Sequence, residues 1–486
     1  MKKIIQDRNN QETGQIIVLL AISLVVVLIV AALAVDGGMI YSERRFAQNA
    51  ADASSLAGAG IILHSMEELD GDTGEREVTS KYFLCPSESS DISEEVVARD
   101  KLSLAIEAAK TKAIEVADLN NFPKLPYLGL IEKTDSSEDD DIIGDHGIVI
   151  ECVNQGDDKY INVDVRISSQ ISTAFAHLIF PGPLRTSNIA VTQVEPRRNI
   201  GWGNAIISLS EECQNNTDGM EFTGTGDIAV YGGNIHSNSC LIGSGNISVM
   251  ANPIYNEIGE IIGYDEGSIT LNDETEVLNG GAEIFPDPEG SVEIKEVDPL
   301  DGPNCDLADP ISGNTYQTGE YPSGIKITNG TWQFEPGTYC LTGDLEITGG
   351  TVTGYGVFFF MDEGDVRITG NASVKLTAPI DPDPWAGMLI YMDEDNPGLI
   401  TLVGTDQSLF SGTVFAPTGN IEVGGTSDGT TLSDCSVLPM GVPCTSASFS
   451  VQLIGNYVKV VGTSVIDILF DETSNFYVVG NLFLLE

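Results

Sequence analysis

One pattern recurs in Gly324-Ile325-Lys326-Ile327, Asp344-Leu345-Glu346-Ile347 and Asp365-Val366-Arg367-Ile368. The three copies begin 20 and 21 residues apart, and each places a charged side chain between two apolar ones. Alternation with a period of two is typical of a β-strand that buries one face, and Gly or Asp before it is typical of a turn. The pattern therefore predicts short strands separated by tight corners.

The same pattern extends through the whole C-terminal region. Further copies occupy residues 227–230, 246–249, 268–271, 291–294, 399–402 and 420–423. Six of the eight intervals between the first apolar residues of successive copies lie between 19 and 23 residues. Because a period near 20 residues is close to one coil of a parallel β-solenoid, we expect residues 200–486 to form an all-β right-handed parallel β-helix. A β-sandwich or barrel is the competing interpretation. The two longer intervals predict loops that leave one face, such as residues 379–385.

The charge is uneven along the chain. The 486 residues carry 72 acidic and 23 basic side chains, for a net charge of −49. Residues 1–199 hold 31 acids and 18 bases, whereas residues 200–486 hold 41 acids and 5 bases. Such acidity argues against a nucleic-acid partner, because phosphates would be repelled. The length suits two or three domains.

An uncharged segment lies near the N-terminus. Residues 16–35 contain no charged side chain and are long enough to cross a bilayer as a helix. Lys2, Lys3 and Arg8 precede this segment and favour a cytoplasmic N-terminus over residues 1–13. A cleaved secretory signal peptide is the alternative. A retained anchor predicts a single-pass protein of the cell envelope with the bulk of the chain outside the cytoplasm.

The apolar segment is expected to continue as a packing helix. Residues 39–60 are rich in Ala and carry an apolar stripe at helical spacing. We therefore expect residues 14–64 to hold one long helix of about 45 residues. Gly37 and Gly38 are expected to weaken or bend it between its two halves.

This N-terminal region carries a family resemblance. Gly14-Gln15, the apolar run, Asp36-Gly37-Gly38 and Gln48-Asn49-Ala50-Ala51-Asp52-Ala53 resemble the N-terminal module of the TadE/TadG-like family. The resemblance implies a membrane-anchored, exported assembly or surface protein associated with Flp-type (tight adherence) pili, without enzymatic activity. Gly14 has no Glu five residues later, so processing by a prepilin peptidase is not expected.

Residues 65–199 are expected to form a small exported α+β domain. The sequence pattern predicts a helix over 94–120, a strand pair over 147–153 and 160–167, an acidic loop over 135–141, a short helix over 171–180 and a strand over 189–194.

All eight cysteines follow the apolar segment, which favours disulfides in an exported chain. Pairing of sequence neighbours is the preferred arrangement among the possible connectivities: Cys85–Cys152, Cys213–Cys240, Cys305–Cys340 and Cys435–Cys444.

The C-terminal region offers weak candidates for chemistry. Asp362, Asp365, Asp393 and Asp395 supply oxygen ligands that could hold calcium, although solvated turns are the simpler interpretation. His236 is the only histidine after residue 200, and we expect it to be a hydrogen-bonded surface residue. We therefore predict no enzyme and no obligate cofactor. The expected role is a structural or interaction protein in pilus assembly, adhesion or surface architecture, with pilus-assembly or surface proteins as partners. The alternative is a carbohydrate-binding or carbohydrate-active β-helix, with glycans as partners and Trp385 as the best candidate for a sugar contact.

Overall fold

The computed structural model of the chain contains two compact units. Unit 1 comprises Met1–Arg197 and Val479–Glu486, and unit 2 comprises Arg198–Val478. The structure describes residues 4–485 except 70–75, 123–126, 133–146, 156–157, 172, 177–183, 212, 214–218, 256–260, 273–276, 280–282, 291–293, 298–299, 306–312, 406–407, 426–448, 463–465 and 472–473. We expected residues 200–486 to be one domain, but the last eight residues return to unit 1.

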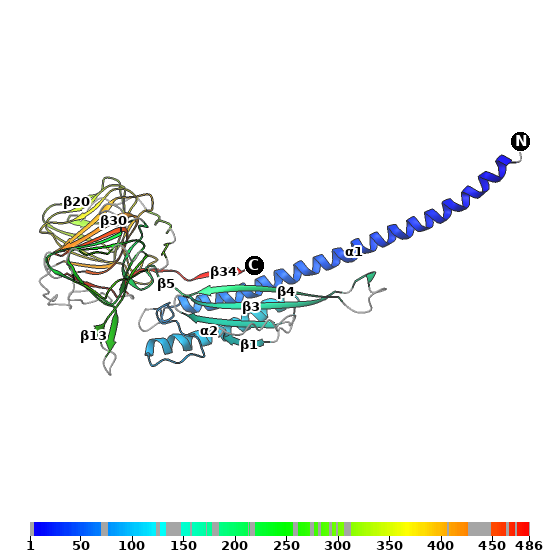
Figure 1. The fold of residues 1–486 in the computed structure, drawn as a ribbon, viewed down its shortest axis with the longest axis horizontal. Coiled ribbons are helices and arrows are strands. Elements are labelled where there is room, and N and C mark those ends of the chain that lie inside the picture. The colour runs from blue at the N-terminus through cyan, green and yellow to red at the C-terminus, as the bar shows by residue number, and fades with distance from the viewer. Residues whose placement is uncertain are drawn as a thin grey trace. The chain divides into compact units, whose positions relative to one another are not determined.

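Helix α1 runs without interruption over Ile4–Glu67 (Figure 1). Gly37 and Gly38, which were expected to weaken or bend the helix, both lie inside the continuous α1. Each glycine costs about 1 kcal/mol of helix propensity, which the long apolar and Ala-rich flanks offset. The helix is also longer than the 45 residues expected.

Unit 1 also contains a second helix, α2, and a five-stranded sheet. Its strand order is β1-β2-β3-β4-β34, parallel between β1 and β2 and antiparallel elsewhere. The bounds are α2 Ser93–Leu119, β1 Tyr127–Glu132, β2 Gly147–Gln155, β3 Asp158–Ile171, β4 Leu184–Glu195 and β34 Asn481–Leu485. The predicted helix and strands are present. The short helix predicted over 171–180 starts too early, because Ile171 ends β3 and residues 174–175 form a bend. Ala176 is in a 3-10 turn, and residues 172 and 177–180 lie outside the described residues. The predicted acidic loop over 135–141 lies outside the described residues.

Small residues let α1 approach its neighbours closely. Ala47, Ala50 and Ala51 are fully buried in the core of unit 1. A Cβ atom at Gly58 would lie 3.2 Å from the carbonyl oxygen of Ala109 and 3.3 Å from Cβ of Ala113, both on α2. The Ala-rich half of α1 is therefore a packing face, as the sequence predicts.

Unit 2 is built around a 25-stranded sheet that is parallel in all its pairings. Its first strands are β6 Asn204–Ser208, β7 Gly219–Gly224, β8 Asp227–Tyr231, β9 Asn234–Ser237, β10 Leu241–Gly243, β11 Asn246–Met250, β14 Ile269–Leu271, β15 Val277–Asn279, β16 Ile284–Phe285 and β17 Glu289–Gly290. Its later strands are β18 Thr315–Tyr316, β19 Gly319–Tyr321, β20 Ile325–Ile327, β21 Thr331–Phe334, β22 Gly337–Leu341, β23 Leu345–Ile347, β24 Thr351–Tyr355, β25 Val357–Met361, β26 Val366–Ile368, β27 Ser373–Thr377, β28 Met388–Met392, β29 Leu399–Gly404, β30 Leu409–Gly425, β31 Phe449–Gly462 and β32 Ile466–Leu469. Outside this sheet, β5 Arg198–Asn199 pairs with β33 Tyr477–Val478, and β12 Asn252–Tyr255 pairs with β13 Ile261–Asp265.

Strands three apart in the chain pair with each other in the later half of unit 2. One ladder joins β20, β23, β26, β29 and the end of β30, with Ile325, Leu345, Val366, Ile400 and Ile421 in register. Two further ladders start from β18 and β19 and follow the same rule. The register of this ladder matches the sequence repeat residue for residue.

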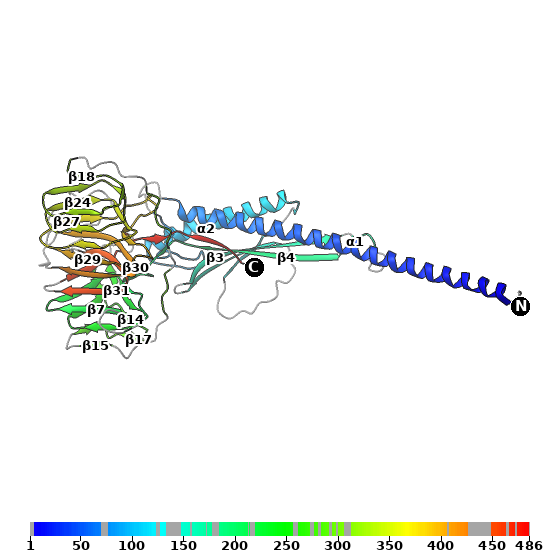
Figure 2. The ribbon, with the colours of Figure 1, turned by 90° about the horizontal axis from the view of Figure 1, so that it is seen from above.

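The stack does not follow the order of the chain. Strand β31 pairs with β30 on one side and with β6 and β7 on the other. The half that starts at β18 therefore ends against the half that starts at β6, and Figure 2 shows the resulting order from β18 through β31 and β7 to β17. The chain thus enters and leaves unit 2 in the middle of the stack, where β5 and β33 pair.

A segment outside the stack connects its two ends. It follows β17 and precedes β18, and described parts of it contact successive levels of the stack. The backbone N–H of Lys295 donates to Oδ1 of Asn238 at 2.9 Å, and the Tyr391 hydroxyl donates to the carbonyl oxygen of Leu300 at 2.8 Å. Cys305 forms a disulfide with Cys340 on β22. These contacts hold the segment against the stack as it passes from β17 at one end to β18 at the other.

Candidate functional site

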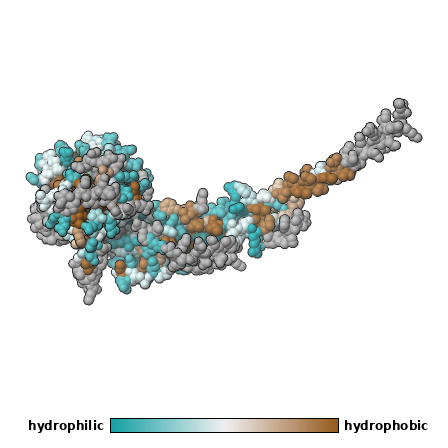
Figure 3. Space-filling view, in the orientation of Figure 1, coloured by the Kyte–Doolittle hydropathy of each residue, from teal (hydrophilic) through white to brown (hydrophobic). Residues whose placement is uncertain are grey.

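The apolar part of α1 is exposed along its length. Within Ile17–Glu67 this helix is long and apolar enough to cross a membrane, and none of its most apolar window is buried inside the protein. Figure 3 shows this stretch as a continuous brown surface. Exposing so many large apolar side chains to water is unfavourable, at roughly 25 cal/mol per Å². The exposed face therefore requires an apolar environment outside the chain.

Asp36 marks the end of this exposed stretch. Its carboxylate is only 5% exposed and accepts hydrogen bonds from three consecutive backbone N–H groups. Oδ1 accepts from Ala174 at 2.7 Å, and Oδ2 accepts from Phe175 at 3.0 Å and from Ala176 at 2.5 Å. Hydrogen bonds to an ionised acceptor are about twice as strong as neutral ones. The first charged residue after the apolar run thus holds the segment that follows β3.

Further polar residues join α1 to the sheet beyond Asp36. The Gln48 side-chain amide donates to Oδ1 of Asp52 at 2.8 Å and to the carbonyl oxygen of Ile189 at 3.1 Å. The Thr192 hydroxyl donates to the Ser55 hydroxyl at 2.9 Å in a buried contact. Gln48 of the family motif and Ser55, just beyond it, therefore bind α1 to β4.

Other candidate residues of the N-terminal motif make no such contact that the structure describes. Asn49 is exposed on α1. Gly14 and Gln15 lie in α1, and their side chains are outside the described part of the chain. The sequence missed Glu43, whose carboxylate accepts a hydrogen bond from the Ser169 hydroxyl on β3. Spacing could have indicated it, since Asp36 and Glu43 are seven residues apart and share one face of a helix.

The cysteines form three of the four pairs that the sequence favours. Cys85 pairs with Cys152 in unit 1. Cys213 pairs with Cys240, and Cys305 pairs with Cys340, in unit 2. Cys435 and Cys444 lie outside the described residues. All the cysteines that the structure describes are paired.

The calcium candidates lie in two neighbouring turns. Asp362 and Asp365 follow β25, and Asp393 and Asp395 follow β28, which pairs with β25. Oδ1 of Asp365 accepts from the backbone N–H of Leu399 at 2.9 Å, and Oδ1 of Asp393 accepts from that of Asp395 at 3.0 Å. Among the described residues, no group of three or more His, Cys, Asp or Glu side chains converges on one point.

A buried amide joins the two turns instead. Asn396 is 6% exposed, and its side chain donates to the carbonyl oxygens of Met361 at 3.1 Å and Gly364 at 3.2 Å. The turns are thus held together by hydrogen bonds to the backbone.

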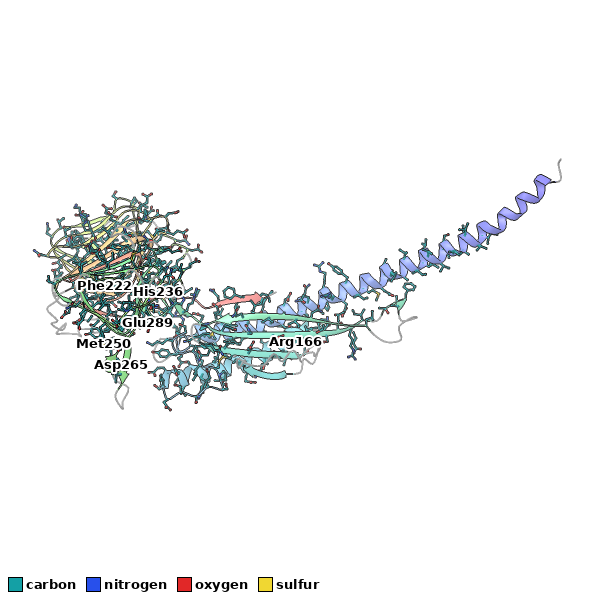
Figure 4. All side chains as sticks on the ribbon, in the orientation of Figure 1. Arg166, Phe222, His236, Met250, Asp265 and Glu289 are labelled. Carbon is teal, nitrogen blue, oxygen red and sulfur yellow. A yellow bond between two sulfur atoms is a disulfide. The ribbon has the colours of Figure 1, made fainter. Side chains whose placement is uncertain are left out.

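His236 is fully buried, contrary to the expected surface position (Figure 4). Nδ1 lies 2.8 Å from the Thr270 hydroxyl, and Nε2 lies 3.0 Å from Oδ1 of Asn238. Burial lowers the pKa of His236, the hydrogen bond that its ring donates to Oδ1 of Asn238 opposes this, and the nearby Lys295 charge lowers the pKa further. Both ring nitrogens are occupied by structural contacts.

Trp385 also packs against the protein. Its ring stacks on Phe358 with 4.6 Å between ring centroids and on Phe476 with 5.8 Å. These contacts pack the partly buried indole against an apolar cluster of unit 2 that includes Phe358 and Phe476.

The comparisons with known proteins identify the N-terminal region. Residues 14–60 match the family model described as "Putative Flp pilus-assembly TadE/G-like". The match covers the apolar stretch, Asp36 and the Gln48 to Asp52 motif, so the resemblance seen in the sequence is confirmed for this region. No curated protein and no solved structure matches the chain.

Proposed function

We propose that the protein is a membrane-anchored, exported component of Flp-type pilus assembly with a structural or interaction role. The main support is that the TadE/G-like match at residues 14–60 coincides with a helix whose two halves have different surroundings. The first half of α1 exposes an apolar surface long enough to cross a bilayer, and the second half packs into a folded unit. Roles in adhesion or in the architecture of the cell surface are compatible variants of the same proposal.

The proposed orientation places residues 1–13 in the cytoplasm and the chain from Asp36 onward outside it. Lys2, Lys3 and Arg8 precede the apolar stretch, which supports this direction. Disulfides in both units support an oxidising compartment. The acidity of residues 200–486 favours solubility of a large β-rich body in that compartment.

We further propose that unit 2 is a right-handed parallel β-helix with three faces. The three ladders that join strands three apart support one coil per three strands. Parallel strands joined by a crossover are right-handed in about 98% of known cases. Such a body is rigid along its axis and would present long surfaces to partner proteins.

We propose a non-catalytic role for this body. His236, the histidine that a polysaccharide enzyme could use as an acid or base, has both ring nitrogens in hydrogen bonds and no exposure. Trp385, the best sugar contact by sequence, is partly buried and stacks on Phe358. Both observations weigh against the carbohydrate alternative.

Charges placed in the apolar stretch test the proposal. Each Arg at the centre of a spanning helix costs about 2.5–3.5 kcal/mol, so Leu24→Arg with Val27→Arg should release the protein from membranes. In a host that assembles Flp pili with this chain, the same pair should abolish pilus assembly. Leu104→Arg with Leu119→Arg on α2 is the matched control, because both leucines are exposed and the folded unit is unchanged. A double variant in the apolar stretch that stays in membranes and assembles normal pili would contradict the proposal.

A further inference from the structure

The position of Asp36 locates one boundary of the bilayer on the protein. This inference rests on the proposed membrane anchor. Residues 16–35 are 20 residues without charge, which as a helix extend about 30 Å, the thickness of the hydrocarbon core. Asp36 follows directly, so it lies where the hydrocarbon ends and the headgroup layer begins.

The bend at residues 174–176 is held at this same level. Three backbone N–H groups in a row donate to the Asp36 carboxylate, so the chain after β3 cannot move away from the start of the packing half of α1. The Ser169 hydroxyl on β3 donates to Glu43, two turns further along α1, and fixes the direction of the strand. The end of β3 and the described residues that follow it therefore lie at the level of the membrane surface.

The bend exposes a large apolar side chain at this level. Phe175 is 45% exposed although its own backbone N–H is bound by Asp36. Val35 and Met39, on the turns of α1 either side of Asp36, are 48% and 41% exposed. These side chains extend the exposed apolar surface of the spanning stretch to the level of Asp36, which holds the backbone of Phe175.

We propose that the bend at residues 174–176 is a membrane-contact element, with Phe175 inserted into the interfacial layer of the bilayer that α1 crosses. Asp36 is the positioning residue for this element. The bilayer is the fitting occupant because the exposed Phe175 is held by Asp36, the residue that directly follows the stretch assigned to the lipid. Aromatic rings concentrate at this depth in membrane proteins. The three N–H groups satisfy the carboxylate, so Asp36 can lie at the edge of the hydrocarbon without full hydration.

The element gives the anchor a second point of attachment. A single helix leaves the folded part of unit 1 free to tilt about the membrane normal. A second contact, offset from α1 and fixed to it by Asp36, restricts that tilt. The proposed consequence is a defined orientation of unit 1 on the outer surface.

Depth-dependent fluorescence quenching tests the element on the full-length protein. The chain with Phe175→Trp is reconstituted into phosphatidylcholine–phosphatidylglycerol vesicles with or without phosphatidylcholine brominated near the headgroup. The native Trp202, Trp332 and Trp385 all lie in unit 2, and their emission is subtracted with the unsubstituted chain. We expect the added emission to be blue-shifted and mostly lost in brominated vesicles.

Leu104→Trp is the matched control. Leu104 is 75% exposed on α2, which contacts α1 at Gly58, about 33 Å along the helix from Asp36. Its added emission should be that of a water-exposed indole and should be unaffected by bromine. Equal emission and quenching for Phe175→Trp and Leu104→Trp in vesicle-bound protein would overturn the element while leaving the anchor intact. Failure of the protein to float with vesicles would overturn the anchor and the element together.

Removing the Asp36 carboxylate tests whether Asp36 positions Phe175 at the bilayer or whether Phe175 reaches it without Asp36. Asp36→Ala, combined with Phe175→Trp, should keep the protein bound to vesicles but abolish the quenching, because the three N–H groups lose their acceptor. Asp36→Asn keeps one acceptor oxygen, so this variant should retain part of the quenching. Quenching unchanged in Asp36→Ala, with the Cys85–Cys152 disulfide intact as a check on folding, would overturn the positioning role.

Discussion

A buried glutamine joins the entry and exit of unit 2 to the middle of the stack. Gln452 on β31 has no exposed surface. Its Nε2 donates to Oδ1 of Asn199 at 2.6 Å and to the carbonyl oxygen of Asn204 at 2.7 Å, both near the entry of the chain. Its Oε1 accepts from the Thr413 hydroxyl at 3.2 Å, and its backbone N–H donates to Oδ1 of Asn475 near the exit.

Gln452→Glu should disrupt these hydrogen bonds with almost no change in the shape of the side chain. The substitution replaces the Nε2 donor by a carboxylate oxygen that faces two acceptors. It removes two hydrogen bonds worth about 1 kcal/mol each and leaves a buried charge without an opposite charge nearby. Total losses of about 3–5 kcal/mol are typical of such a change. We expect a loss of roughly 4 kcal/mol, which lowers the Tm of unit 2 by roughly 8 °C.

The assay is thermal unfolding of the full chain in detergent, followed by near-ultraviolet circular dichroism. Gln333→Glu is the control, because Gln333 is exposed on β21 and the substitution adds the same charge to the same unit. The deficit of Gln452→Glu should shrink as the pH falls, because burial raises the pKa of a carboxyl group and the folded state then takes up the proton first. If Gln452→Glu unfolds at the same temperature as Gln333→Glu, the assignment of Gln452 to a buried hydrogen-bonded node is refuted.

Three further predictions follow from the contacts of unit 2. Replacing Cys305 and Cys340 together by Ser should lower the free energy of unfolding by roughly 4 kcal/mol, since the disulfide closes a loop with a sequence separation of 35, whereas an unchanged urea midpoint would contradict this. Because His236 has a lowered pKa in the fold, the unfolded chain binds its proton first, so stability is complete above about pH 6.5 and falls below it; His236→Gln should flatten this slope in pH-dependent melting. Because the carboxylates of Asp365 and Asp393 bind backbone N–H groups, Tm values measured with calcium and with a chelator should coincide, and a calcium-dependent rise would reveal a site.

The repeat pattern of the sequence predicts strands and one ladder well. Ile325, Leu345, Val366, Ile400 and Ile421 lie in register because each strand of the ladder buries the same apolar position. Eight of the nine predicted strands are present, and the copy at 291–294 lies partly outside the described residues. The long interval between Val366 and Ile400 contains a loop, as expected.

The same pattern misleads where intervals look regular by chance. Ile247 and Ile269 are 22 residues apart, but Ile247 pairs with Ile284 and Ile269 pairs with Ile235. In the sequence, the hairpin β12–β13 lies between Ile247 and Ile269 and accounts for most of the interval. A period alone cannot assign a strand to one of several ladders, because all ladders bury the same kinds of side chain.

The permuted order of the stack could not be predicted from the repeat. Val458 lies between Ile421 and Met220, although Met220 is more than 200 residues away in the chain. The half of the stack that starts at β6 and the half that starts at β18 bury the same kinds of side chain. The local pattern therefore does not tell which strands of one half pair with the other. The polar residues that fix the order, such as Gln452, are isolated within apolar strands and have no sequence signature.

For the candidate site, the motif identified the correct helix and only part of the contacts. Asp36, Gln48 and Asp52 were selected from the sequence, and the structure gives Asp36 partners in the segment after β3 and Gln48 a partner on β4. Those partners are backbone groups of residues 174–176 and Ile189, more than 130 positions away. Backbone partners have no residue-type signal, so only the fold reveals them.

The topology of the chain across the membrane is the most direct test of the proposed anchor. Alkaline phosphatase, which is active only outside the cytoplasm, would be fused in turn before residue 1 and after Glu486 in cells that express the full chain. The account predicts an active enzyme for the C-terminal fusion, an inactive one for the N-terminal fusion, and both proteins in the membrane fraction at alkaline pH. Activity of the N-terminal fusion, or an inactive C-terminal fusion of the intact protein, would contradict it.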